Sequence, residues 1–209
     1  MGRLINGPNG PFIGKAGSFV GYTVNGVGYI KGLYKLRTKP PTEKEAFNQK
    51  KFAVAQKWLH PLTIFVRAGF RGYNERFQGF VAAKSYLMKN ALKVIDDQIV
   101  IDPALVRISS GTLPLPENLE CTFQEPDIFR FAWTPSLWET HGYDQLIVLV
   151  YDIENGQAYG KVYGKDRSSG EQLLSVGNPI GKTFHAYAGF IAADRSRQSD
   201  SVHFGKFEF

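Results

Sequence analysis

Residues 145–151 read Gln-Leu-Ile-Val-Leu-Val-Tyr, a nearly continuous apolar run that follows Asp144 and precedes the turn signal Glu154-Asn155-Gly156. A short run rich in branched residues between turn signals predicts a strand that is covered on both faces. Further strands are predicted at Ile128 to Trp133, Tyr159 to Tyr163, Gln172 to Val176, Thr183 to Ala193 and Val202 to Phe209. About six short strands at this spacing indicate a β-sandwich.

Two of these segments resemble strands of the fibronectin type III family. Ile128-Phe-Arg-Phe-Ala-Trp133-Thr-Pro135 is similar to its second strand, where a core tryptophan precedes a proline-bearing bend, and Tyr187-x-Gly189-x-Ile191-x-Ala193 is similar to its sixth. The resemblance covers residues 125–209, and Gly189 departs from the branched residue usual at that place. Such domains are mainly spacers and binding modules, so the resemblance implies interaction rather than catalysis.

A helical segment is predicted before the sandwich. After Pro40-Pro41, Thr42 and Glu45 have the spacing of a capping box, and no Gly or Pro occurs until Pro61, where the helix is expected to kink or end. A second helix is predicted from Gln78 to Lys93. The apolar residues of the first recur at three- and four-residue spacing: Phe47, Val54, Trp58 and Leu62. The pair leads, through a predicted linker at Leu113 to Pro116, into the sandwich.

The first 41 residues, here called the arm, hold the clearest turn signal of the chain. Val20 to Val24 and Val27 to Lys31 flank Asn25-Gly26, which predicts a hairpin closed by a type I′ turn. Closing it sets Tyr22 opposite Tyr29 on one face and leaves Gly21 and Gly28 on the other. A face so poor in side chains suits the close approach of another backbone. Both a neighbouring molecule and the arm's own domain remain candidates for that approach.

Charge is divided unevenly along the chain. Residues 1–111 carry 17 Lys and Arg against 6 Asp and Glu, residues 112–209 carry 8 against 13, and the first 42 residues contain no acid. A basic front and an acidic back favour head-to-tail attraction between copies, or binding of the front to an acidic polymer such as nucleic acid.

No catalytic or metal-binding motif is found. Gly14-Lys15 lacks the Gly and the Ser or Thr of a P-loop, because Asn9 and Ala16 stand at those positions. The four histidines are far apart in the sequence and Cys121 is alone, so neither a disulfide nor a multi-cysteine zinc site is expected. We therefore expect no enzyme, cofactor, metal or small-molecule substrate. The chain shows no signal peptide and no transmembrane segment, which implies cytoplasmic synthesis and leaves the final location open.

The chain as a whole resembles an uncharacterised family of Bacteroidota, known only as a domain of unknown function, with an arm, a helical pair and a C-terminal sandwich. The residues that carry the resemblance are Met1-Gly-Arg, Gly14-Lys-Ala-Gly17, Val20-Gly-Tyr22, Lys39-Pro-Pro-Thr42, Ser85-Tyr, Lys89-Asn90-Ala91 and Ser110-Gly111-Thr-Leu113. The resemblance implies a bacterial or phage origin and transfers no activity.

These observations predict an α+β protein with a β-hairpin arm (1–41), two helices with short strands (42–112) and an antiparallel fibronectin type III-like or immunoglobulin-like sandwich (113–209). The leading hypothesis is a structural protein that self-assembles into a filament, a ring or a virion or surface assembly by docking its arm on a neighbour. Its expected interface residues are Gly21, Tyr22, Gly28, Tyr29 and Lys31.

Two other hypotheses stay open. The arm interleaves cations with aromatic rings, as single-strand nucleic-acid binders do, and the candidate contacts are Lys31, Tyr34, Lys35, Arg37 and Lys39. Glycan binding on exposed sandwich aromatics would use residues such as Trp138 and Tyr143.

Overall fold

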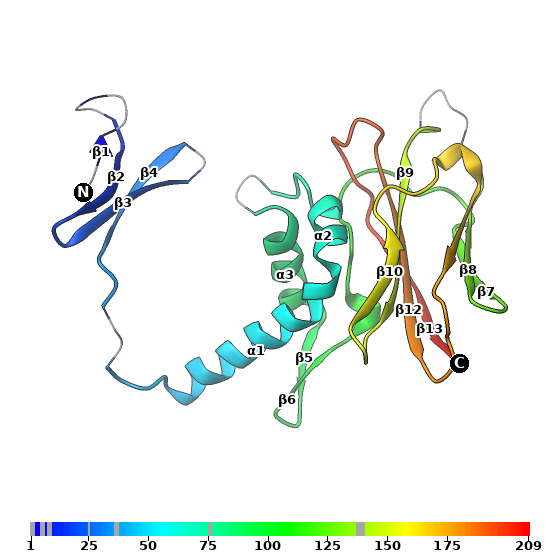
Figure 1. The fold of residues 1–209 in the computed structure, drawn as a ribbon, viewed down its shortest axis with the longest axis horizontal. Helices are drawn as coiled ribbons and strands as arrows, with labels where there is room; N and C mark the ends of the chain where they lie inside the picture. Colours follow the sequence, from blue (N-terminus) through cyan, green and yellow to red (C-terminus); the bar gives the residue numbers. More distant parts are fainter. Residues whose placement is uncertain are drawn as a thin grey trace. The chain divides into compact units, whose positions relative to one another are not determined.

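The computed structural model of the chain describes residues 3–4, 7, 10–24, 26–35, 38–74, 77–136 and 141–209. They divide into two compact units, Met1–Glu43, which contains the arm, and Lys44–Phe209, here called the body. The body has three layers in Figure 1: helices, a four-stranded sheet and a three-stranded sheet. The predicted α+β class with an antiparallel sandwich is confirmed. No helix in the described part of the chain is long and apolar enough to cross a membrane.

The sandwich consists of two antiparallel sheets. One has the strand order β10-β9-β12-β13 and the other β11-β8-β7. The strands are β7 (Glu120–Gln124), β8 (Ile128–Ala132), β9 (Gln145–Asp152), β10 (Gln157–Lys161), β11 (Glu171–Ser175), β12 (Thr183–Ile191) and β13 (Val202–Glu208). Strands β9 and β12 form the centre of the larger sheet and pair over eight residues, from Phe184 opposite Asp152 to Ile191 opposite Gln145.

The apolar run in β9 has a clear physical cause, because both faces of this strand are buried. Ile147, Leu149 and Tyr151 face the helices. The alternate residues, Leu146, Val148 and Val150, face the three-stranded sheet. A strand between two apolar layers has no solvent-facing row, so the usual alternation of polar and apolar residues is absent.

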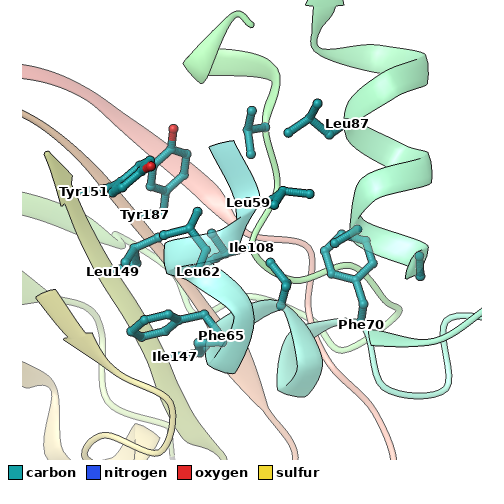
Figure 2. Packing of buried hydrophobic residues seen from close by; sticks show 14 of the residues in the cluster. Leu59, Leu62, Phe65, Phe70, Leu87, Ile108, Ile147, Leu149, Tyr151 and Tyr187 are labelled. Atoms are coloured by element: carbon teal, nitrogen blue, oxygen red, sulfur yellow. The ribbon is translucent and has the colours of Figure 1, made fainter. Parts of the chain in front are cut away.

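The helical layer follows the arm. It comprises α1 (Glu43–Leu59), a 3-10 turn (His60–Leu62), α2 (Thr63–Gly69) and α3 (Gly79–Asn90). Helix α1 ends one residue before His60-Pro61, as predicted, because proline cannot donate the hydrogen bond that would continue the helix. Figure 2 shows Leu62 and Phe65 of this layer on the side of Leu149 and Ile147 of β9, while Leu59 points toward Leu87 of α3. Residues of 42–112 and of 113–209, which the sequence predicts as separate domains, therefore share one hydrophobic core.

Residues 110–113, between the helical layer and the sandwich, are hydrogen-bonded to both of these parts. The Ser110 N–H donates to the Gly69 carbonyl at the end of α2, over 3.0 Å. The Leu113 N–H donates to the Gln198 carbonyl before β13, over 2.9 Å. Leu113 itself is buried in the core between the two sheets. The predicted linker is thus a packed part of the body.

Gly189 lies where this segment crosses the sheet. A Cβ atom at position 189 would stand 2.5 Å from Oγ of Ser109, closer than real Cβ contacts allow. A larger side chain at this position requires the side chain of Ser109 to move.

Two elements differ from expectation. The second helix ends at Asn90 rather than Lys93, because the chain turns into a hairpin of β5 (Leu92–Ile95) and β6 (Gln98–Ile101). Its two-residue turn, Asp96-Asp97, has positive φ at both positions (47° and 59°), as a type I′ turn requires. Strand β7 was not predicted from the sequence, because its alternating exposed and half-buried residues at the sheet edge give a weak strand signal.

Candidate functional site

The arm forms a four-stranded antiparallel sheet in the order β1-β2-β3-β4. Its strands are β1 (Arg3–Leu4), β2 (Phe12–Ala16), β3 (Phe19–Val24) and β4 (Val27–Gly32). The predicted register is present, with Val24 opposite Val27, Tyr22 opposite Tyr29 and Val20 opposite Lys31. Asn25 of the predicted turn lies outside the described residues, and Gly26 has a φ of +81°.

One face of the arm carries an aromatic cluster. The rings of Tyr22 and Tyr29 stack with centroids 5.6 Å apart and an interplanar angle of 21°. The Lys31 Nζ lies 5.2 Å from the centroid of Tyr22, within the range of a cation–π interaction. These three residues of the predicted interface therefore form one preorganised patch, and both tyrosines stay exposed.

The opposite face shows why Gly21 and Gly28 are glycines. A Cβ at Gly21 would lie 2.1 Å from the carbonyl oxygen of Phe12, and one at Gly28 would lie 2.8 Å from Cβ of Pro11. The close approach expected at these glycines is thus made within the arm by the segment that enters β2. Tyr22, Tyr29 and Lys31 remain the predicted interface residues that present side chains to solvent.

The described residues of the arm form no hydrophobic core. Gly21 is the only buried residue among its described positions. Large apolar side chains are exposed on both faces and beyond the last strand: Leu4, Phe19, Tyr22, Val24, Val27, Tyr29, Ile30 and Tyr34. A hollow of about 360 Å³ lies between Phe12, Ala16, Phe19 and Ile30. Sheets normally bury at least one face against another layer, so this sheet presents unused apolar surface.

The described candidate nucleic-acid contacts are spread over the end of β4 and the segment after it, unlike the compact cluster of Tyr22, Tyr29 and Lys31. Tyr34 is 83% exposed, and Lys35 is also exposed. Lys31 lies over the ring of Tyr22 in the stacked cluster. Arg37 lies outside the described residues, and the structure places Lys39 in the exposed segment before α1. Among the candidate glycan-binding aromatics, Tyr143 is exposed and Trp138 lies outside the described residues.

The body brings together two histidines that the sequence keeps apart. His185 Nδ1 and His203 Nε2 lie 3.0 Å apart, with the rings nearly parallel. Burial, together with His203 and Lys206, lowers the pKa of His185 to about 4. Burial also lowers the pKa of His203, against an opposing effect of Asp102. The pair was not predicted because a bulge shifts the register between β12 and β13, so that His203 lies opposite Tyr187.

A charged cluster lies at one end of the sandwich. Asp144 Oδ2 is 2.9 Å from His141 Nδ1 and 3.6 Å from Arg167 Nη1. Arg167 is buried, and its Nη1 donates to the Pro114 carbonyl over 2.9 Å. The Trp133 indole in turn donates to the Arg167 carbonyl. These contacts tie the loop before β9, the loop before β11 and the predicted linker together, which is a structural role.

Neither cluster forms a metal centre. The part of the chain that the structure describes contains no group of three or more His, Cys, Asp or Glu able to hold a metal ion. Cys121 is half-buried on β7, and burial raises the pKa of its thiol to about 12, which keeps it protonated. A protonated thiol is a poor nucleophile, so the expected role of Cys121 as a packing residue fits its surroundings.

The fold and the exposed arm define a β-sandwich protein with a helical layer on one sheet and a β arm whose described residues form no core. A family model matches residues 11–205, and the chain belongs to DUF6266, a family of unknown function. The matched range includes β2, β3 and β4 of the arm. No curated protein and no solved structure matches the chain significantly. Membership in an uncharacterised family is thus confirmed, while the Bacteroidota origin and the fibronectin type III resemblance stay predictions.

Proposed function

We propose that this chain is a non-enzymatic structural protein that assembles with copies of itself, each arm docking on a neighbouring body. The observation that carries the proposal is the absence of a core in the described arm, where the larger apolar side chains are exposed. Ordering a residue costs about 1–2 kcal/mol of backbone entropy. Burying a Val, Leu, Ile or Phe side chain stabilises by about 1.5–3 kcal/mol. A docking surface supplies that burial.

The contact is of the head-to-tail type. The surface that docks belongs to Met1–Glu43, whereas the surface that receives it belongs to the body, so the two patches differ. Contacts between different patches produce a closed ring or an open filament, according to the rotation between subunits. A filament, a ring or a layer in a virion or on a surface all use this geometry.

Sedimentation velocity and electron microscopy of the full chain test the proposal. We expect concentration-dependent oligomers for the full chain and monomers for a variant that lacks residues 2–37. The body of that variant keeps both hydrophobic clusters, since their residues lie in Lys44–Phe209. A full chain that stays monomeric up to near-millimolar concentration at low salt contradicts the proposal.

Nucleic-acid binding is the second candidate, favoured by the acid-free sequence of the arm and the exposed Tyr34. A gel-shift titration at two salt concentrations decides it, because binding through phosphates weakens steeply with salt. Lys35→Glu provides the matched variant, since it lies beyond β4. Affinity that falls with salt and with Lys35→Glu supports this candidate.

A further inference from the structure

We infer that β4 of the arm adds to the edge strand β7 of a second copy, antiparallel, with Lys31 opposite Glu120. This inference rests on the proposed self-assembly and names the surface that receives the arm. It joins the four-stranded arm sheet to the three-stranded sheet of the neighbour. The occupant of the β7 edge is therefore another copy of this chain.

Both β4 and β7 are edge strands. Strand β4 follows β3 in the order β1-β2-β3-β4, and β7 is the last strand of β11-β8-β7. They are six and five residues long. An edge strand presents a row of free backbone N–H and C=O groups, and an added strand of similar length satisfies them. Antiparallel pairs are two- to threefold more frequent than parallel ones.

The charges of the two edges are complementary. The first 42 residues hold no acid, and Lys31 lies near the end of β4. Strand β7 begins with the exposed Glu120, and three further acids flank it in sequence: Glu117, Glu125 and Asp127. The antiparallel register puts the basic end of β4 beside the acidic start of β7. Opposite charges at an interface speed encounter and set register.

The other edges of the sandwich fit the arm less well. Strand β10 carries Lys161, which repels a basic strand, and in β13 Lys206 and Glu208 are paired with each other. Strand β13 also contains Gly205 with a φ of +102° next to its irregular register with β12, and a bulge of this kind disrupts pairing. Glu171, at the start of β11, is already paired with Arg130. The β7 edge is the acidic and regular one.

The faces of the two strands match in the same register. Ile30, which is 68% exposed, comes opposite Cys121, and Gly28 comes opposite Phe123. Cys121 and Phe123 are half-buried at the rim of the core between the sheets. Ile30 therefore extends that core, while Pro11, which lies over Gly28, offers an apolar surface to Phe123.

A shift by one residue breaks this match. It would turn Lys31 toward the apolar rim of the core and Ile30 toward solvent, because successive side chains of a strand point to opposite faces. Burial of an unpaired ammonium is strongly unfavourable. The pattern of side chains thus selects the register that pairs Lys31 with Glu120.

Cysteine cross-linking between two populations of full-length chains tests the register. In a Cys121→Ser background, one population carries Val27→Cys and a differently tagged one carries Gln124→Cys. These positions lie opposite each other when Lys31 is opposite Glu120. The matched control is Ser175→Cys, which lies in the same row as Gln124 but on the other edge strand of that sheet. In the proposed assembly three strand spacings, about 14 Å, separate Val27 from Ser175, beyond the reach of a disulfide.

The outcomes of this experiment distinguish the proposed self-assembly from the assignment of β7 as the edge that receives the arm. We expect a heterodimeric disulfide between the Val27→Cys and Gln124→Cys populations, at least tenfold more abundant than with Ser175→Cys. Oligomers without a preferential disulfide at Gln124 overturn the assignment of β7 and leave the proposed assembly standing. Monomers alone overturn both.

Charge reversal provides a second measurement. Lys31→Glu and Glu120→Lys each set like charges opposite one another, and we expect the dissociation constant to rise about tenfold in each case. The double variant restores the opposite pair and most of the affinity. Glu154→Lys, in the turn after β9, is the control of equal charge change and should leave the affinity within about twofold. Equal weakening by Glu120→Lys and Glu154→Lys without recovery in the double variant overturns the pair.

Discussion

Gly189→Ala tests the close packing of residues 108–113 on β12. The new Cβ would lie 2.5 Å from Oγ of Ser109 and 3.2 Å from Oγ of Ser199. Ser199 is held in place, because its hydroxyl accepts a hydrogen bond from the Phe190 N–H over 2.8 Å. Overpacking of a core costs about 1–3 kcal/mol, and Gly to Ala returns about 0.4–1 kcal/mol through the unfolded chain. We therefore expect a net loss of about 1–2 kcal/mol in the free energy of unfolding.

The second half of this prediction uses Ser109→Ala. The Ser109 hydroxyl is buried and has no hydrogen-bond partner among the described residues. Its removal should be neutral or stabilise the fold by up to about 1 kcal/mol, since an unpaired buried polar group is unfavourable. In the Ser109→Ala background the closest clash at position 189 disappears. Gly189→Ala should then cost little, and the two substitutions should be coupled by about 1–2 kcal/mol.

Urea unfolding followed by tryptophan fluorescence measures the four proteins of this cycle, at a concentration where light scattering shows monomers. The midpoint should shift while the denaturant slope stays constant. A neutral Gly189→Ala, or an equal cost in both backgrounds, would refute the close contact between Ser109 and β12.

Three further predictions concern the body. Burial lowers the pKa of His185 to about 4, so between about pH 6.5 and pH 4 the unfolded chain binds a proton that the folded chain does not. The free energy of unfolding should therefore fall by about 1–2 kcal/mol, after allowance for partial exposure, as the pH is lowered through this window, and should level off below about pH 4. The same loss at acid pH in a His185→Asn, His203→Asn variant would contradict this prediction. Arg167→Met removes the buried guanidinium beside Asp144 and should cost about 3 kcal/mol in urea unfolding, whereas a change below about 1 kcal/mol would show that the contact between Arg167 and Asp144 contributes little to the fold. Cys121 should react with iodoacetamide far more slowly in the folded chain than in urea, because its thiol stays protonated, and equal rates would disprove its burial.

Local patterns predicted much of the fold. The hairpin around Gly26 appeared with the expected register, since its turn depends on residues adjacent in sequence. The end of α1 before Pro61 follows equally from local backbone chemistry. The apolar run of β9 correctly indicated a strand buried on both faces.

Other features depended on partners far away in the sequence. The end of α3 at Asn90 was missed, because the following residues pair with β6 instead of extending the helix. The contact of His185 with His203 required a bulge that no sequence pattern announced. In the candidate site, the register predicted that Tyr22 lies opposite Tyr29, whereas the sequence left open whether a neighbouring molecule or the arm itself fills the glycine face, which Pro11 and Phe12 cover.

The residues of the chain therefore specify its strands, its helix ends, the hairpin of the arm and the uneven distribution of charge. They do so because backbone preferences and side-chain periodicity act over a few neighbouring positions. Tertiary structure alone decided that the helices pack on β9 and β12, that Gly189 admits a crossing segment and that the described part of the arm lacks a core. Burial is a property of surfaces that meet in space, and segments far apart in the sequence supply those surfaces.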